Sequence, residues 1–202
     1  KHEMESLGLL VAEETRKEYE SFFGQIDDYL ERGKTPSYHQ FLISKTPRIL
    51  TFTGLPDNEI SLSTSVLNKA KKIHGLDNEE IMDSVKGLFN PMLVFSSDKS
   101  TLEAENDSIL VITEATVKNG KPLTLALELE KKLANRKPVY VVNDIRSIHD
   151  RNLVAQNGVD ILKEWMDKGL LRYYDDKKIS DWLAIKRVQF PLSLTKSDID
   201  TI

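Results

Sequence analysis

The sequence predicts an α+β domain: N-terminal helices, then a four-stranded antiparallel sheet that helices cover on one face, then C-terminal helices. Three observations favour this class. Apolar residues recur at helical spacing over most of residues 3–90, alternate with a period of two over 92–145, and return to helical spacing after 152. Helices that precede and follow a run of strands are typical of α+β folds.

Before the sheet we expect, in chain order, a helix at 3–32, a second helical region at 37–53, a short strand at 60–63, a helix at 65–73 and a helix between Asp77 and Pro91. Either Ser63 or Thr64 is expected to cap the helix that follows them. Asp77 and Glu80 have capping-box spacing, which indicates that a helix begins there.

The four strands of the sheet are predicted at 92–96, 108–117, 122–130 and 138–145. The dipeptide Asn119-Gly120 is a strong signal for a tight hairpin between the second and third strands. In the third strand every second residue from Leu123 to Leu129 is leucine, so one face is expected to be buried. Successive strands with one tight turn among them favour an antiparallel meander.

After the sheet we expect a helix at 152–167, a short edge strand at 170–174 and a last helix at 176–185. The tail is expected to be poorly ordered. The chain then divides into an N-terminal helix at 1–35, interpreted as the end of an upstream region, a main domain at 36–190, and a C-terminal tail at 191–202.

Composition excludes several kinds of site. The chain has 202 residues, of which 40% are hydrophobic and 30% charged, as in an ordinary folded domain. It has no cysteine, which excludes disulfides, thiolate zinc sites and thiol catalysis. Its net charge of -4 argues against a general nucleic-acid binder. Contact with nucleic acid would therefore need a local basic patch, for which KKLANRK at 131–137 is a candidate, unless it is a solvated loop.

No membrane span or signal peptide is expected. No apolar run approaches the roughly 18 residues of a transmembrane helix. The start, KHEMESLGLL, lacks the basic region and apolar core of a signal peptide. Because it also lacks an initiating methionine, the sequence is interpreted as a piece of a longer protein.

Several blocks follow one another in an order shared with a known family. They are FLISKTPRIL, ISLSTSVLNKAKKIHGL, LFNPMLVF, SILVITE with NGKPLTLALEL, VVNDIRSIHDR and GLLRYYDDKKISDWL. Over about residues 38–190 the chain thus resembles the C-terminal domain of phage MuF-like head morphogenesis proteins. The resemblance implies a toxin or effector module attached to a phage or polymorphic-toxin protein. It also implies similarity to the Barnase-EndoU-Colicin-RelE group of metal-independent ribonucleases.

A module of this kind would cleave RNA, with tRNA among the candidate targets, in the bacterial cytoplasm after delivery by a phage particle or by secretion. The resemblance implies two partners, the RNA substrate and a cognate immunity protein that acts as antitoxin. It implies no metal, no other cofactor and no membrane partner.

Metal-independent RNA cleavage needs a base for the 2′-hydroxyl, an acid for the leaving oxygen, and donors for the charge on phosphorus. His74 is the first catalytic candidate, because the family commonly has a basic residue, histidine and glycine in this block, and histidine suits acid-base chemistry. Lys71 lies near it by helical spacing and is a substrate-binding candidate. The alternative is that His74 is a cationic residue at a helix end before the Gly75 cap.

The densest polar stretch, NDIRSIHDR, lies where a strand is expected to turn into a helix, a place where anions bind. Ser147 and Arg151 are interpreted as catalytic groups that contact the phosphate, and Arg146 and His149 as substrate-binding residues, with His149 a second acid-base candidate. The family more often has Tyr-Gly-Arg where this chain has His-Asp-Arg, so Arg151 matches the family and His149 does not. The alternative is a polar turn with solvated charges.

Two other blocks supply the remaining candidates. Tyr173 matches an aromatic residue of the family and is assigned a catalytic role, by positioning a phosphate or stacking on a base. Lys177, which matches the basic residue after it, and Thr113, a hydroxyl on a strand, are assigned to substrate binding. The alternatives are that Tyr173 belongs to the core and that Thr113 only favours a strand.

Two other functions stay open. One is a nucleotidyl- or ADP-ribosyl-transferase toxin, for which the sequence has no strong signature. The other is a non-enzymatic virion-associated or partner-binding module, which the acidic charge favours over a general RNA binder. The nuclease hypothesis requires the four catalytic candidates to line one positive cleft. A binding module should have them scattered and should expose an apolar patch.

Overall fold

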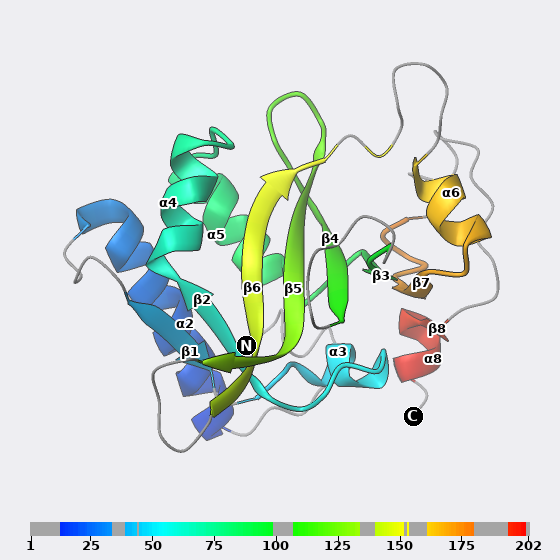
Figure 1. The fold of residues 1–202 in the computed structure, drawn as a ribbon, viewed down its shortest axis with the longest axis horizontal. Helices are drawn as coiled ribbons and strands as arrows, with labels where there is room; N and C mark the ends of the chain where they lie inside the picture. The colour runs from blue at the N-terminus through cyan, green and yellow to red at the C-terminus, as the bar shows by residue number, and fades with distance from the viewer. Residues whose placement is uncertain are drawn as a thin grey trace.

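The computed structural model describes residues 13–33, 39–43, 45–98, 107–133, 140–151, 153, 161–179 and 194–200. Over these residues the fold is α+β, but the expected four-stranded antiparallel sheet is wrong. The strands form an eight-stranded mixed sheet in the order β1-β2-β6-β5-β4-β3-β7-β8 (Figure 1). They are β1 (Gln40–Ile43), β2 (Glu59–Ser63), β3 (Leu93–Ser96), β4 (Ser108–Thr116), β5 (Pro122–Leu133), β6 (Tyr140–Asp150), β7 (Leu171–Tyr174) and β8 (Leu194–Thr195).

The expected meander forms the centre of this sheet, where β3, β4, β5 and β6 are antiparallel neighbours in chain order. A turn joins β4 to β5, and Gly120 has a φ of 81° within it, as the Asn-Gly signal indicates. On one side, β2 pairs with β6 in parallel and with β1 in antiparallel fashion. On the other side, β7 is antiparallel to β3 and parallel to β8.

The outer strands show why the sequence under-predicted the sheet. All four are short, and β1 falls within residues 37–53, where a helix was expected. The β2–β6 and β3–β7 pairs also join strands that are not consecutive in the chain. Hydrophobic periodicity identifies an element but does not specify which strands pair. For the same reason β7, expected at an edge, lies between two other strands.

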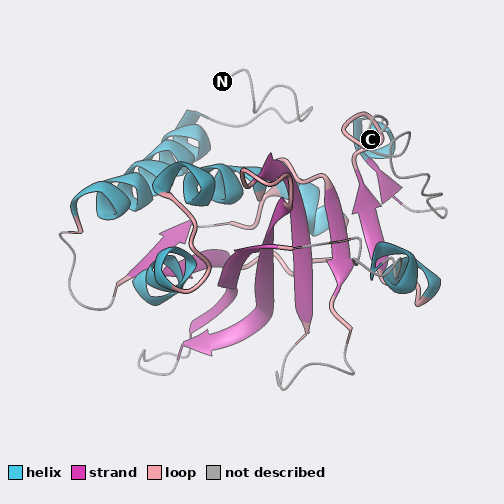
Figure 2. Cartoon of the chain, turned by 90° about the horizontal axis from the view of Figure 1, so that it is seen from above, coloured by secondary structure: helices cyan, strands magenta, loops and turns pink. Residues whose placement is uncertain are grey.

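Helices cover both faces of the sheet, whereas the sequence indicated one. The helices α2 (Glu13–Arg32) and α5 (Asn78–Gly87) pack on one face and α6 (Ile161–Asp167) on the other. Figure 2 shows α2, the longest helix, lying across its face of the sheet. The remaining helices are α3 (Arg48–Phe52), α4 (Thr64–Lys72) and α8 (Lys196–Asp200). The nearly continuous apolar run in β4 reflects burial on both faces.

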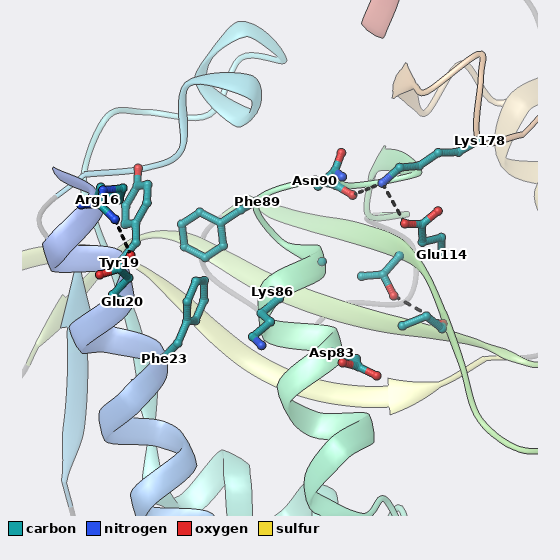
Figure 3. A pocket seen from close by; sticks show the side chains of 13 residues that line it. Arg16, Tyr19, Glu20, Phe23, Asp83, Lys86, Phe89, Asn90, Glu114 and Lys178 are labelled. Atoms are coloured by element: carbon teal, nitrogen blue, oxygen red, sulfur yellow. Dashed lines mark hydrogen bonds and ion pairs between the residues drawn. The ribbon is translucent and has the colours of Figure 1, made fainter. Parts of the chain in front are cut away.

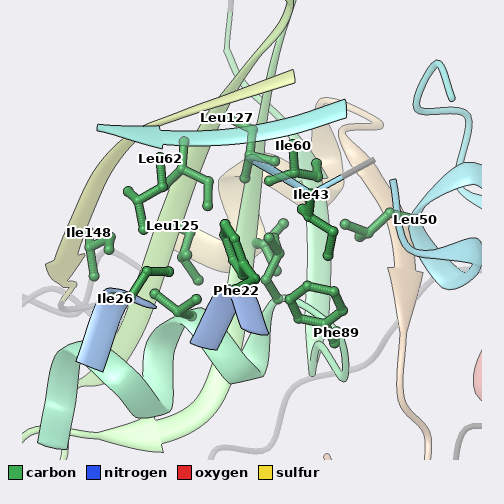
Figure 4. Close-up of a cluster of buried hydrophobic side chains, with 14 of the residues drawn as sticks. Phe22, Ile26, Ile43, Leu50, Ile60, Leu62, Phe89, Leu125, Leu127 and Ile148 are labelled. Carbon is green, nitrogen blue, oxygen red and sulfur yellow. The ribbon is translucent and has the colours of Figure 1, made fainter. Parts of the chain in front are cut away.

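The larger core lies between the sheet and helices α2 and α5 (Figure 4). Phe22 and Ile26 of α2 are buried there with Leu125 and Leu127 of β5. The leucines at 123, 125, 127 and 129 all belong to this core, so the expected alternation of β5 is confirmed. A second, smaller core packs Leu162, Trp165 and Met166 of α6 against the opposite face.

The sequence signals at two helix starts are also confirmed. The Ser63 hydroxyl caps α4 by accepting a hydrogen bond from the Val66 N–H at 3.2 Å. Asp77 and Glu80 form the capping box of α5, with N–H to carboxylate distances of 2.8 and 3.0 Å.

Other expectations lie partly outside the described residues. The helix at 3–32 is described from Glu13 and the helix at 152–167 from Ile161. Of the helix expected at 176–185, residues 176–179 are described and form a turn, and the rest lies outside the described residues. The tail was expected to be poorly ordered, but residues 194–200 form β8 and α8. There the Asp198 carboxylate accepts a hydrogen bond from the Thr195 N–H at 2.9 Å.

Candidate functional site

The candidate site lies along one edge of β6, where the neighbouring element changes from β2 to α4. Residues Glu59–Leu62 of β2 pair with the first half of β6, up to Ile145. The chain then leaves the sheet at Ser63 and continues as α4, which contacts β6. The C-terminal end of α4 is thereby carried to the second half of β6.

A glycine that caps the C-terminal end of α4 sets the position of His74 there. The His74 N–H donates to the Lys69 carbonyl at 3.2 Å, and the Leu76 N–H donates to the Ala70 carbonyl at 3.0 Å. Gly75 between them has a φ of 67°, a left-handed conformation that closes the helix. The expected glycine cap is therefore present. It does not decide against a functional His74, because the same geometry directs the half-buried imidazole toward β6.

A bulge in β6 sets the direction of its side chains. Ile145 pairs with Leu127, but Ser147 pairs with the next residue, Ala126, so Arg146 is the extra residue and is exposed. Ala126 packs against the α6 core, which places Ser147 on the α6 face of the sheet. The alternation of the strand puts His149 on the same face.

His74 and His149 meet at this edge. Their ring centroids are 5.6 Å apart and the ring planes are inclined by 40°. The Ser147 hydroxyl lies 3.4 Å from Nδ1 of His149. Burial lowers the pKa of His149 to about 4, and the positive charges of Arg151 and His74 act in the same direction. His149 is therefore neutral near pH 7 and has a nitrogen lone pair that can accept a proton.

Arg151 completes the group. Its guanidinium carbon lies 5.0 Å from the centroid of the Trp165 ring on α6, a cation–π arrangement. Burial lowers the pKa of Arg151, yet a guanidinium stays charged in proteins. We call His74, Ser147, His149 and Arg151 the histidine cluster.

The surroundings of the histidine cluster are basic although the whole chain is acidic. Lys69, Lys71 and Lys72 form the last turn of α4 and are exposed, as is Arg146 on β6. Such a local positive field attracts a phosphate backbone. The other basic candidate, KKLANRK, is described only at Lys131–Leu133, where Lys131 pairs with Asp144 at 3.0 Å.

The structure does not bring the other three candidates to the histidine cluster. Tyr173 is fully buried in the larger core, on β7, which β3, β4 and β5 separate from β6. The Thr113 hydroxyl donates to the Leu123 carbonyl at 2.8 Å. Lys177 is exposed in the turn after β7.

A cavity lies elsewhere, between α2, α5 and the end of β4 (Figure 3). Its volume is about 490 Å³, and aromatic side chains of Tyr19, Phe23 and Phe89 form part of its wall. The half-buried Lys178 amine donates to the Asn90 carbonyl at 2.8 Å and lies 3.4 Å from the Glu114 carboxylate. Its lining combines three cations with three carboxylates and includes no histidine: Arg16, Lys86, Lys178, Glu20, Asp83 and Glu114.

Sequence reasoning missed two residues at the histidine cluster. Trp165 was not singled out as a candidate, and its ring lies under Arg151. Thr124 on β5 pairs directly with His149, a neighbour that depends on the β5–β6 register, which no local signal specifies. Among the described residues no group of three or more histidine or acidic side chains is placed to hold a metal ion, and no described helix is long and apolar enough to cross a membrane.

The described chain is thus an α+β domain with a mixed sheet and a basic cluster of two imidazoles at one strand edge. A family model, the phage MuF-C-terminal domain, matches residues 65–181. This match covers more than half of the chain, which therefore belongs to the phage MuF C-terminal domain family. The matched segment contains the whole histidine cluster. Comparison with curated proteins and with solved structures found no match.

Proposed function

We propose that this phage domain is a toxin effector that cleaves RNA without a metal, as an endoribonuclease whose acid and base are His74 and His149. One observation carries the proposal: a helix end and a strand, far apart in sequence, bring two imidazoles, a hydroxyl and a guanidinium together in a basic setting. Two imidazoles beside an arginine provide the acid, the base and the phosphate ligand that transesterification of RNA requires.

The low pKa of His149 assigns the roles. As the neutral imidazole, His149 takes the proton of the 2′-hydroxyl while the 2′-oxygen forms a bond to phosphorus. The bond from phosphorus to the 5′-oxygen breaks, and His74 gives a proton to that oxygen. The products are a 2′,3′-cyclic phosphate and a 5′-hydroxyl, so atoms and charges balance without a co-reactant.

The polar side chains around the two histidines have separate roles. Arg151, held over Trp165, directs its planar N–H groups at the phosphate oxygens. Ser147 supplies a hydroxyl beside His149. Lys71 and Arg146 are exposed and bind the RNA backbone on either side. Tyr173, Thr113 and Lys177 have no part in this step, because they lie away from the histidine cluster, the first two on β7 and β4 and the third in the turn after β7.

The same geometry argues against a purely partner-binding module. Such a module should expose an apolar patch. Among the described residues Ile73, 69% exposed, is the one exposed large hydrophobic side chain. A single exposed residue is ordinary on a soluble protein.

The test is regulated expression in bacteria of wild type, His74→Ala and His149→Ala. His39→Gln is the matched control, since His39 packs against Phe41 at a ring distance of 4.7 Å, away from the histidine cluster. Wild type and the control should arrest growth and fragment RNA, and the two alanine variants should not. Growth and intact RNA with all four proteins, at equal soluble levels, would refute the nuclease.

A toxin of this kind needs a cognate immunity protein in the cell that makes it, and we propose one as the second partner. Co-expression of genes that neighbour this one should suppress the growth arrest, and the suppressing product should co-purify with the chain. Suppression without co-purification would contradict direct inhibition.

A further inference from the structure

Thr124 has an unusual position in β5. Its side chain is fully buried, and its hydroxyl oxygen has no hydrogen-bond partner. Most buried hydroxyls in proteins are paired, because an unpaired one loses its bonds to water without replacement. The unpaired Thr124 hydroxyl therefore needs an explanation, and its neighbours supply one.

Thr124 lies directly opposite His149 in the antiparallel β5–β6 pair. Side chains opposite each other share a face, with Cβ atoms about 4.5–5.5 Å apart. On its other side Thr124 pairs with Ile112, which belongs to the α6 core, so this face is the one that Ser147 and His149 share. The His149 ring thus has a hydroxyl on its own strand and a hydroxyl on the neighbouring strand.

We propose that Thr124 is a positioning residue whose hydroxyl accepts a hydrogen bond from Nδ1–H of His149, in exchange with the Ser147 hydroxyl and without the need for bound substrate. This inference rests on the proposed function. At 3.4 Å the Ser147 hydroxyl is a long partner for Nδ1, so a modest rotation of the ring exchanges one acceptor for the other. Holding the proton on Nδ1 leaves the lone pair on Nε2, the nitrogen that takes the 2′-hydroxyl proton.

The same contact stabilises His149 after it has accepted that proton. The charged groups that act on the ring are Arg151 and His74, which oppose an imidazolium, and Asp150, which favours it. The Thr124 hydroxyl on β5, as an additional hydrogen-bond acceptor, offsets part of the repulsion from Arg151 and His74. Thr124 does not touch the substrate, because its side chain is fully buried.

The experiment compares wild type, Thr124→Val and Thr124→Ser, with Thr113→Val as the matched control. Nitrogen NMR of labelled histidine reports which ring nitrogen carries the proton, and only four histidines contribute signals. Wild type and Thr124→Ser should have His149 protonated on Nδ1 near pH 7. Thr124→Val should shift the proton toward Nε2 and lower the pKa of His149 further. RNA cleavage by Thr124→Val should fall about tenfold, part of the ~10²- to 10⁴-fold effect of an acid-base group.

Thermal melting separates positioning from a structural role. Valine keeps the shape of threonine and removes a hydroxyl that has no partner, so Thr124→Val should melt at or above the wild-type temperature. Thr113→Val removes a hydrogen bond of 2.8 Å and should melt lower, with the His149 signals unchanged.

An unchanged tautomer and pKa of His149 in Thr124→Val, or a wild-type ring protonated on Nε2, would overturn the inference. The NMR comparison needs no substrate. If wild type fails to cleave RNA, the proposed function fails, and the His149 signals still decide whether Thr124 holds the ring.

Discussion

The rings of His74 and His149 lie side by side, with centroids 5.6 Å apart, although one ends a helix and the other belongs to the far half of a strand. The approach depends on β2, which pairs with only the first half of β6 and then gives way to α4. The candidate site lies along the second half of β6, with which β2 does not pair. Each part of this arrangement makes a measurable prediction.

The first prediction concerns stability and pH. Burial lowers the pKa of His149 from 6.5 to about 4. At pH values between these two pKa values, His149 binds a proton in the unfolded chain but not in the folded chain. The stability that the neutral His149 ring contributes is therefore present above pH 6.5 and is lost as pH falls through about 4. After allowance for solvent at this half-buried ring, the loss is about 2 kcal/mol.

Urea unfolding near pH 7 and near pH 4 measures this loss. His149→Gln should show a smaller pH dependence than wild type by that amount, whereas His39→Gln should match wild type. Equal pH dependence in all three proteins would show that His149 titrates normally.

The second prediction concerns the helix end that carries His74. A Cβ at Gly75 would meet no atom within 4 Å, so the φ of 67° is the only obstacle to a side chain. Gly75→Ala should destabilise the fold by about 1 kcal/mol and should reduce RNA cleavage by moving His74. Gly24→Ala, in the middle of α2 and equally unobstructed, should instead stabilise by about 0.5–1 kcal/mol. Denaturant unfolding checks both signs, and a stabilised Gly75→Ala would contradict the left-handed stop.

The third prediction concerns Arg151. Arg151→Lys keeps the charge but removes the planar fork and the stacking on Trp165. Cleavage should fall at least about tenfold while stability changes by about 1 kcal/mol or less. Arg146→Lys, at the exposed bulge residue, should retain most of its activity. Full activity in Arg151→Lys would mean that only its charge is needed.

The fourth prediction concerns the junction that aligns β2 with β6. The fully buried Asn143 amide donates to the Thr46 hydroxyl at 2.8 Å and to the Pro56 carbonyl at 2.7 Å, and its oxygen accepts from the Glu130 N–H. Asn143→Ala removes all three hydrogen bonds, although the Thr46 hydroxyl keeps its bond to the Asn58 carbonyl and the Pro56 carbonyl keeps its bond from the Asn58 N–H. The variant should lose about 2–3 kcal/mol of stability. Denaturant unfolding measures the cost, and a variant as stable as wild type would contradict the role of this network.

The sequence predicted those parts of the fold whose signals are local. The Asn119-Gly120 hairpin, the Asp77–Glu80 capping box and the leucine alternation of β5 each depend on residues close together in the chain, and the structure contains all three. The parallel β2–β6 pair and the second buried face depend on contacts between distant segments. The four-stranded, one-faced sheet was wrong for that reason.

The residues of the candidate site likewise divide into those that the sequence predicted and those that depend on contacts between distant segments. Residue type and family resemblance identified His74, Ser147, His149 and Arg151, which the structure brings together. Tyr173 was singled out by the same reasoning, but the alternation of β7 buries it in the larger core. Thr124 was missed because only the register of two paired strands places it beside His149.

One measurement tests the central claim most directly: incubation of the purified chain with defined RNA in the presence of a metal chelator, followed by analysis of the new ends. The account predicts cleavage that leaves 2′,3′-cyclic phosphate and 5′-hydroxyl ends, and its loss in His149→Ala. RNA that stays intact with wild type, or is cut equally well by His149→Ala, would contradict it.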